Sequence, residues 1–179
     1  GCNQSGQLGD GTRTDRHRPQ KVMQVNGKDA LFRVESASAG AEHTLVMLKQ
    51  PGEVHAHLLA FGAHQGQLVE SDLPSVLSGI AYEADRPVRI LEKVVAASAG
   101  RNHSLAVLED GSCMAWGKNT YGQLGDGSTR HRAGVEKVLD NVRTVAAGLD
   151  YSMAILKTGA LMAWGHNSGG GGGGGAPRE

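Results

Sequence analysis

Three blocks of sequence recur in the same order along the chain, and this internal repetition limits the possible folds more than any other feature. The first block contains an anchoring glycine and reads SAGAEHTLVML, SAGRNHSLAVL and AAGLDYSMAIL around Gly40, Gly100 and Gly148. The second block ends in an aromatic residue and a glycine, and the third reads GCNQSGQLGDGT at the start of the chain and GKNTYGQLGDGS later. A repeat of about 50 residues is typical of the blades of a β-propeller.

The repeat divides the chain into three units and the start of a fourth. We place the units at residues 1–61, 62–116 and 117–164, whereas residues 165–179 begin a fourth unit and end in a glycine-rich flexible tail. The middle unit is degenerate and carries an insertion around residues 73–86. The glycine content outside the tail predicts many tight turns between short strands.

The local pattern within each unit predicts short strands. Residues 103–108 are largely apolar on both faces, as expected for a strand that neighbours cover on both sides. Asp110-Gly111 and Thr158-Gly159 are two-residue turn signals that predict hairpins. A fourth strand of each unit is predicted at Gln20–Val25, Val88–Leu91 and Val135–Leu139. Helical periodicity is confined to a turn or two at Leu73–Glu83. We therefore predict an all-β chain, a partial β-propeller of about three four-stranded antiparallel blades plus a stub.

One set of recurring residues is interpreted as structural. The aromatic residue of the second block occurs once per unit and is expected to pack between blades. The histidine that follows the anchoring glycine recurs in two units and is tyrosine in the third, which favours a hydrogen-bonded structural role over metal binding or acid–base chemistry. The structural repeat positions are Gly40, His43, Phe61, Gly100, His103, Trp116, Gly148, Tyr151 and Trp164.

Charge and cysteine content exclude several classes of protein. Lys and Arg number 18 and Asp and Glu number 18, so the net charge is zero and long-range attraction to nucleic acid or an anionic membrane is weak. We therefore expect no membrane partner, and zero net charge argues against nucleic acid as a partner. The two cysteines, Cys2 and Cys113, exclude a disulfide scaffold and fit a reducing compartment. An intracellular location, cytoplasmic, nuclear or both, is expected.

No residue pattern predicts catalysis, a cofactor or a metal. Gly-Gln-Leu-Gly-Asp-Gly lacks the Lys-Ser/Thr pair of a phosphate loop, and no helix is predicted after it. His55 and His57 alternate onto one strand face with His64 nearby, but no carboxylate or cysteine completes a zinc site at tight spacing. We therefore expect a non-enzymatic protein without a cofactor.

The recurring blocks resemble the repeats of the regulator of chromosome condensation family. The resemblance rests on Gly100-Arg101-Asn102-His103-Ser104, Trp116-Gly117-Lys118-Asn119 and Gly122-Gln123-Leu124-Gly125, and it extends over residues 1–168. The second unit departs from the pattern, because Phe61 replaces Trp and His64 replaces Asn. Members of this family form closed rings of seven blades, so the resemblance implies that the chain is a segment of such a ring.

The resemblance implies several functions without choosing among them. Related rings act as guanine-nucleotide exchange factors for a Ran-type GTPase, chromatin binders, β-lactamase inhibitors, UV-B sensors and appendages of ubiquitin ligases. UV-B sensors place Trp after the anchoring glycine, where this chain has Ala41, Arg101 and Leu149, so that function is not expected. We predict a protein-interaction module. Exchange on a Ran-type GTPase is the alternative, with no residue assigned to it, and chromatin or nucleic-acid binding through arginine loops is a weaker one.

A repeated basic loop is the candidate binding site. Arg16-His17-Arg18 follows the first Gly-Asp-Gly turn, and Arg130-His131-Arg132 follows the second at nearly the same repeat position. Equivalent positions of a propeller lie on one face, so these loops predict a basic patch that binds another protein, with a small GTPase or an acidic surface as the partner. The alternative interpretation is that these residues are solvated loop charges.

Overall fold

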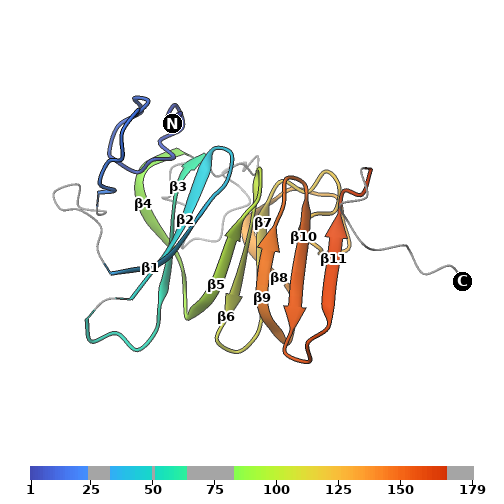
Figure 1. The fold of residues 1–179 in the computed structure, drawn as a ribbon. Helices are drawn as coiled ribbons and strands as arrows, with labels where there is room; N and C mark the ends of the chain where they lie inside the picture. Colours follow the sequence, from blue (N-terminus) through green and yellow to red (C-terminus); the bar gives the residue numbers. More distant parts are fainter. Residues whose placement is uncertain (24–32, 50, 64–82, 169–179) are drawn as a thin grey trace, which may run out of the picture.

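The chain forms antiparallel β-sheets that stand side by side (Figure 1). A computed structural model describes residues 1–23, 33–49, 51–63 and 83–168. Within this part of the chain, no helix is long and apolar enough to cross a lipid bilayer. Each sheet is narrow and twisted, and its strands follow one another in chain order, which is the arrangement of a propeller blade.

Three blades follow one another along the sequence. Blade 1 consists of β1 (Val34–Ala39), β2 (His43–Leu48), β3 (His57–Ala63) and β4 (Glu83–Glu92), in that spatial order. Blade 2 consists of β5 (Val94–Ala99), β6 (His103–Leu108), β7 (Cys113–Gly117) and β8 (Arg132–Leu139). Blade 3 has three strands in the described residues, β9 (Val142–Ala147), β10 (Tyr151–Leu156) and β11 (Leu161–Gly165). The predicted partial propeller is confirmed, with two complete four-stranded blades and three strands of blade 3 in the described residues.

The blades are out of phase with the sequence units. Each unit ends at the third strand of a blade, and the fourth strand of that blade, β4 or β8, comes from the following unit. The N-terminal segment, residues 1–23, therefore precedes blade 1 and lies over one end of it (Figure 1). We call this end the upper end. It also holds the loops 100–102 and 118–131, whereas the hairpin turns 109–111 and 157–159 lie at the lower end.

Two sequence predictions need correction. The strand predicted at Gln20–Val25 contains only an isolated bridge at Met23, whose N–H donates to the Gly9 carbonyl at 2.9 Å, and its last two residues lie outside the described residues. The insertion predicted at 73–86 does not reach Arg86, because β4 begins at Glu83. Residues 73–82, which include most of the possible helical turn, lie outside the described residues.

The predicted hairpins form, but with three-residue connections. Leu108 N–H donates to the Ser112 carbonyl at 2.9 Å, and Gly111 N–H donates to the Leu108 carbonyl at 2.9 Å. Gly111 has φ 92° and Gly159 has φ 90°, a left-handed conformation that glycine adopts without steric cost. A three-residue hairpin that ends in such a glycine matches the right-handed twist of the strands.

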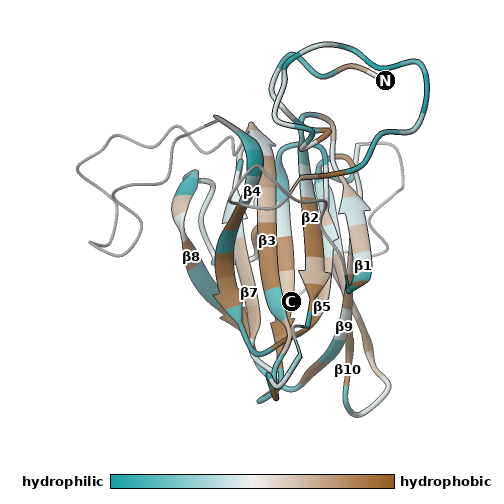
Figure 2. Ribbon diagram, turned by 90° about the vertical axis from the view of Figure 1, so that its left-hand side faces the viewer, coloured by the Kyte–Doolittle hydropathy of each residue, from teal (hydrophilic) through white to brown (hydrophobic). Residues whose placement is uncertain are grey.

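The apolar core lies in the seams between blades. Trp116 belongs to one buried cluster with Leu45, Met47 and Leu58, in the seam of blades 1 and 2. Trp164 packs with Val107 of blade 2, and it is half-buried because β11 has no fourth strand beside it in the described residues. Phe61 instead faces the N-terminal segment, with Val22 among its contacts. Figure 2 shows the apolar residues concentrated on β2, β3 and β7, so stacking the blades is what removes most apolar surface from water.

Candidate functional site

Each Gly-Asp-Gly loop is folded around a buried asparagine. The Asn119 side chain donates to Asp126 Oδ1 and to the Ser128 carbonyl, both at 3.0 Å, and its Oδ1 accepts the Leu124 N–H at 2.9 Å. Asn3 makes the same set of hydrogen bonds in the N-terminal segment, to Asp10, Thr12 and Leu8. Because one buried amide holds several points of each loop, the loops are preorganised at the upper end.

The glycines of these loops are required by the backbone. Gly122, Gly125 and Gly127 have φ of 75°, 81° and 76°, and the three equivalent glycines of the N-terminal segment are also left-handed. A Cβ atom on Gly125 would lie 2.7 Å from Trp164 Nε1, so this glycine also lets the loop pack on the aromatic residue. The repeated glycines therefore allow the left-handed turns, and Gly125 also allows close packing in the seam between blades.

One arginine of each basic loop forms an ion pair inside its own loop. Arg16 Nε donates to Asp10 Oδ2 at 2.7 Å, and Arg132 Nε donates to Asp126 Oδ2 at 2.7 Å. Burial alone would raise the pKa of Asp126, but hydrogen bonds from Arg132, Ser128 and Asn119 outweigh it and lower this pKa to about 2. Arg16 and Arg132 therefore stabilise their loops.

The ion pairs show that the two Arg-His-Arg sequences are offset by two residues in structure. Because Arg16 corresponds to Arg132, His131 corresponds to Asp15 and not to His17. His131 Nδ1 accepts the Asn119 N–H at 2.9 Å, and Asp15 Oδ1 accepts the Asn3 N–H at 2.8 Å. The sequence repeat placed the Arg-His-Arg motif at nearly the same position in the two loops. The structure shows that the residues of the motif have different hydrogen-bond partners in each loop.

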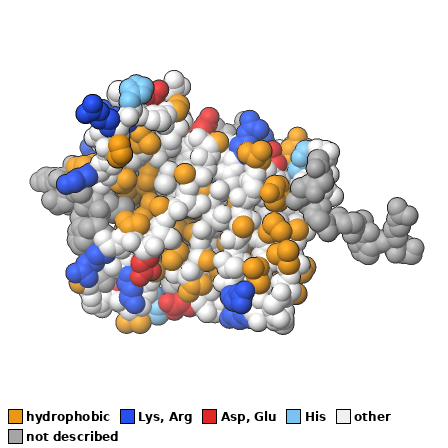
Figure 3. All heavy atoms as spheres, viewed as in Figure 1, with side chains coloured by type: hydrophobic (Ala, Val, Ile, Leu, Met, Phe, Trp, Pro, Cys, Tyr) orange, Lys and Arg blue, Asp and Glu red, His pale blue; other side chains and the backbone are white. Residues whose placement is uncertain are grey.

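Three residues of the basic loops remain available at the surface. His17, Arg18 and Arg130 are exposed, and their side chains make no hydrogen bond or ion pair with a described residue. Both loops lie at the upper end of the blades. In the space-filling view, Lys and Arg side chains lie at the upper left and along the upper edge of the molecule, and others lie at the lower left and lower right (Figure 3).

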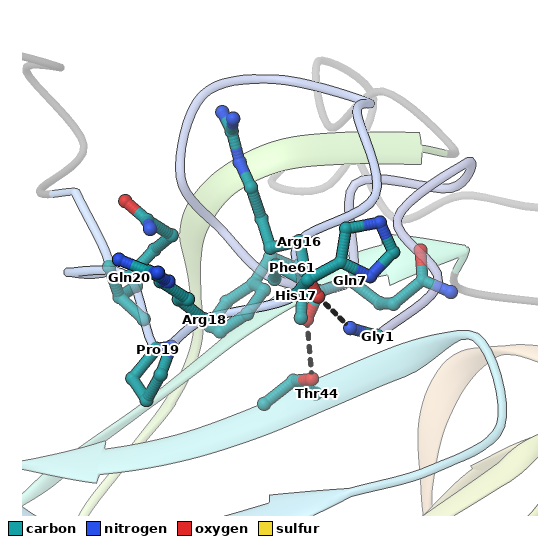
Figure 4. A pocket seen from close by; sticks show the side chains of 11 residues that line it. Gly1, Gln7, Arg16, His17, Arg18, Pro19, Gln20, Thr44 and Phe61 are labelled. Carbon is teal, nitrogen blue, oxygen red and sulfur yellow. Dashed lines mark hydrogen bonds between the residues drawn. The ribbon is translucent and has the colours of Figure 1, made fainter.

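A pocket of about 490 Å³ lies between the N-terminal segment and blade 1. Figure 4 shows Arg16, His17 and Arg18 around it, with Phe61 behind them and Thr44 Oγ1 donating to the Gln7 carbonyl at 2.8 Å. At the equivalent place between blades 2 and 3, Leu105 and Ala115 pack against Leu124 and Trp164. The pocket therefore has the geometry of an inter-blade seam that is open on one side.

A histidine crosses each seam. His43 Nε2 lies 3.0 Å from Ser104 Oγ, and His103 Nε2 lies 2.9 Å from Ser152 Oγ. Ser152 Oγ donates its own proton to the Gln123 carbonyl at 2.7 Å, so it must accept a hydrogen from His103 Nε2. His103 is fully buried, and its Nδ1 has no partner among the described residues. It is therefore a neutral imidazole with the proton on Nε2.

Burial determines the acidity of His103. It lowers the pKa of His103 from 6.5 to about 4, although the charge of Asp150 acts in the opposite direction. The anchoring glycine makes room for the ring, because a Cβ on Gly100 would lie 2.3 Å from His103 Cε1. Gly40 and Gly148 have the same relation to His43 and Tyr151.

The remaining histidines and the buried thiol do not form a reactive cluster. His55 Nδ1 pairs with Glu109 at 2.8 Å, whereas His57 Nε2 pairs with Glu53 at 2.7 Å. Among the described residues, which do not include His64, no group of three or more His, Cys, Asp or Glu could hold a metal ion. Burial raises the pKa of the Cys113 thiol to about 12, so it stays protonated at neutral pH.

The fold and the repeated seams define this chain as a section of a β-propeller, and comparison of its sequence identifies the type. The family model of the regulator of chromosome condensation (RCC1) repeat matches residues 1–47 and 110–155, and a second model of the same repeat matches residues 94–123 and 142–170. The chain belongs to the regulator of chromosome condensation repeat family.

The chain spans only a part of the length of the similar proteins described here. The sequence is 29% identical over 138 residues to the ultraviolet-B receptor UVR8 of Arabidopsis thaliana, which covers 77% of this chain and 29% of the receptor. It is 34% identical over 127 residues to the X-linked retinitis pigmentosa GTPase regulator of Canis lupus familiaris, and this match covers 70% of the chain and 11% of the regulator. Prp20p of Saccharomyces cerevisiae has a similar structure, with a TM-score of 0.53 and 23% identity over 75% of this chain and 31% of Prp20p. The family and the fold together make the chain a repeat module for protein interaction.

Proposed function

We propose that the upper end of the blades binds an acidic surface of a partner protein through exposed arginines of the basic loops. The observation that carries this proposal is the position of Arg18 and Arg130, which are exposed and unpaired within the described residues on loops that buried asparagines hold in place. A cation on a preorganised loop loses less conformational entropy on binding than one on a flexible loop.

The proposal separates the arginines by role. Arg16 and Arg132 keep the loops folded through their ion pairs with Asp10 and Asp126, and Arg18 and Arg130 face the partner. Single exposed charge pairs contribute only about 0–1 kcal/mol, so binding needs several of them and becomes weaker as salt rises. Because the net charge of the chain is zero, such a basic patch is local. A local patch fits an acidic protein surface better than the extended phosphate backbone of a nucleic acid.

The named properties of similar proteins support protein partners. The structure of Prp20p was described with its binding to Gsp1p and histones, and another similar protein is named a GTPase regulator. The sequence identity to Prp20p is only 23%, so this similarity shows a shared fold alone. Nucleotide exchange on a Ran-type GTPase, nucleic-acid binding and a cytoplasmic or nuclear location stay predictions.

Binding of a labelled acidic peptide tests the proposal. The probe is a fluorescent glutamate oligopeptide of about twelve residues, titrated by anisotropy at several salt concentrations. The variant Arg18→Glu/Arg130→Glu should bind about five- to tenfold more weakly at low salt and show a flatter salt dependence. The control Lys49→Glu/Arg143→Glu has the same net charge, but both changes lie at the lower end of the blades. Equal affinities of the two variants would contradict the proposal.

A further inference from the structure

Two large apolar side chains are exposed at the upper end of the described residues. Tyr121 is 46% exposed in the loop between β7 and β8, and Leu149 is 69% exposed in the loop between β9 and β10. Neither belongs to an apolar cluster of the core. Exposed aromatic and aliphatic side chains on preorganised loops are typical of interaction surfaces.

The repeat shows that the fold does not need these side chains. Tyr121 N–H donates to Gln123 Oε1 at 2.9 Å, and Ser5 N–H makes the equivalent bond to Gln7 Oε1 at 3.0 Å. The same backbone conformation is thus reached with a small polar residue. Leu149 follows an anchoring glycine, and Ala41 occupies that position in blade 1. Tyr and Leu at these two places are therefore additions to the shared framework.

A ring contact and a backbone hydrogen bond link the loops that carry these two residues. The rings of Tyr121 and His166 lie with centroids 4.2 Å apart. His166 N–H donates to the Asp150 carbonyl at 2.9 Å, directly beside Leu149. These contacts bring the Tyr121 and His166 rings together and tie the backbone at His166 to the loop that carries Leu149.

Two cationic residues lie in loops that backbone hydrogen bonds tie to this region. Arg101 N–H donates to the Leu149 carbonyl at 3.1 Å, and Lys118 N–H donates to the Asn102 carbonyl at 2.8 Å. Arg101 is exposed and Lys118 is half-buried. Asp150 lies beside Leu149, and its Oδ1 is 3.5 Å from the Gln123 amide, so Arg101, Lys118 and Asp150 together carry one net positive charge. The patch therefore combines an apolar centre with a net positive border.

We propose that the seam patch, formed by Arg101, Lys118, Tyr121, Leu149 and His166, binds a segment of a partner protein in which an apolar side chain is flanked by carboxylates. The inference rests on the proposed function and adds a specificity element to it. Tyr121 and Leu149 would cover the apolar side chain, while Arg101 and Lys118 would bind the flanking carboxylates. Arg18 and Arg130 provide the wider positive field.

A pair of peptides tests the patch. The first is the glutamate oligopeptide used above, and the second carries a central Leu-Phe pair in place of two glutamates. The second should bind wild-type protein about tenfold more tightly, since a modest apolar contact is worth about 1.4 kcal/mol. Tyr121→Ser/Leu149→Ala should abolish this advantage without changing the affinity for the glutamate peptide. Both substitutions use the residue found at the equivalent position, so the melting temperature should not change.

A matched substitution and the charge variant separate the possible failures. Leu161→Ala removes a leucine that is 60% exposed at the lower end, and it should keep the full advantage. Equal affinity of wild-type protein for the two peptides, or an advantage that survives Tyr121→Ser/Leu149→Ala, would overturn the inference. If Arg18→Glu/Arg130→Glu leaves both affinities unchanged while Tyr121→Ser/Leu149→Ala still removes the advantage, the patch stands and the proposed role of the arginine loops fails.

Discussion

The buried histidine between blades 2 and 3 predicts a loss of stability in mild acid. His103 is neutral in the folded protein, with its pKa lowered by burial to about 4, whereas 6.5 is its ordinary value. Above pH 6.5 the folded and unfolded chains are both unprotonated at this residue, and its full contribution is present. As the pH falls from 6.5 toward 4, the unfolded chain binds a proton that the folded chain does not, so stability decreases.

The size of the effect follows from the difference between the two pKa values. At about 1.4 kcal/mol for each pH unit, the shift from 6.5 to about 4 corresponds to about 3 kcal/mol. This loss should be complete near pH 4 and change little below it. It is a large fraction of the total stability of an ordinary domain, which is about 5–15 kcal/mol.

Urea unfolding of His103→Gln across this pH range isolates the contribution. A glutamine amide can donate to Ser152 Oγ but does not titrate, so the variant should lose about 3 kcal/mol less than wild type between pH 7 and pH 4. Loss of stability from carboxylates such as Asp126 occurs in both proteins and cancels in the difference. Parallel curves for wild type and His103→Gln would refute the assignment of His103 as a neutral, buried group.

Other predictions concern the loops and the alternative activity. Arg132→Gln should destabilise the protein by about 1–3 kcal/mol in thermal or urea unfolding because it removes a charged hydrogen bond in the loop, whereas Arg130→Gln should be neutral. Gly125→Ala should cost more stability than Gly127→Ala, since both glycines are left-handed but only the first meets Trp164; equal losses would contradict the packing argument. If the chain acts as an exchange factor, release of labelled GDP from a Ran-type GTPase should accelerate with its concentration, and a flat response would exclude that activity for this chain.

The repeat predicted the number and order of the blades because its blocks recur at regular spacing in the sequence. It could not predict at which residue a blade begins. A tandem repeat can be divided at any point with equal consistency, and the divisions at 61 and 116 fall before the fourth strand of each blade. Pairing of β3 with β4 joins residues on either side of a long insertion, and no local pattern records such a contact.

The basic loops show the same limit at the level of single residues. The motif Arg-His-Arg aligned the two loops by letters, whereas the ion pairs align Arg16 with Arg132. Asp15 and His131 differ in chemistry and still accept the equivalent backbone N–H in the two loops. Tyr121 and Leu149 were missed as a pair because they lie in loops of different blades, and only the seam brings them together.

The most direct measurement for the central claim is a hydrogen-exchange footprint of the bound acidic peptide that carries the Leu-Phe pair. The account predicts slower exchange at the upper end, in residues 100–102, 118–131 and 148–150, and unchanged exchange in the hairpin turns 109–111 and 157–159. Protection confined to the lower turns, or spread equally over both ends of the blades, would contradict binding at the upper end.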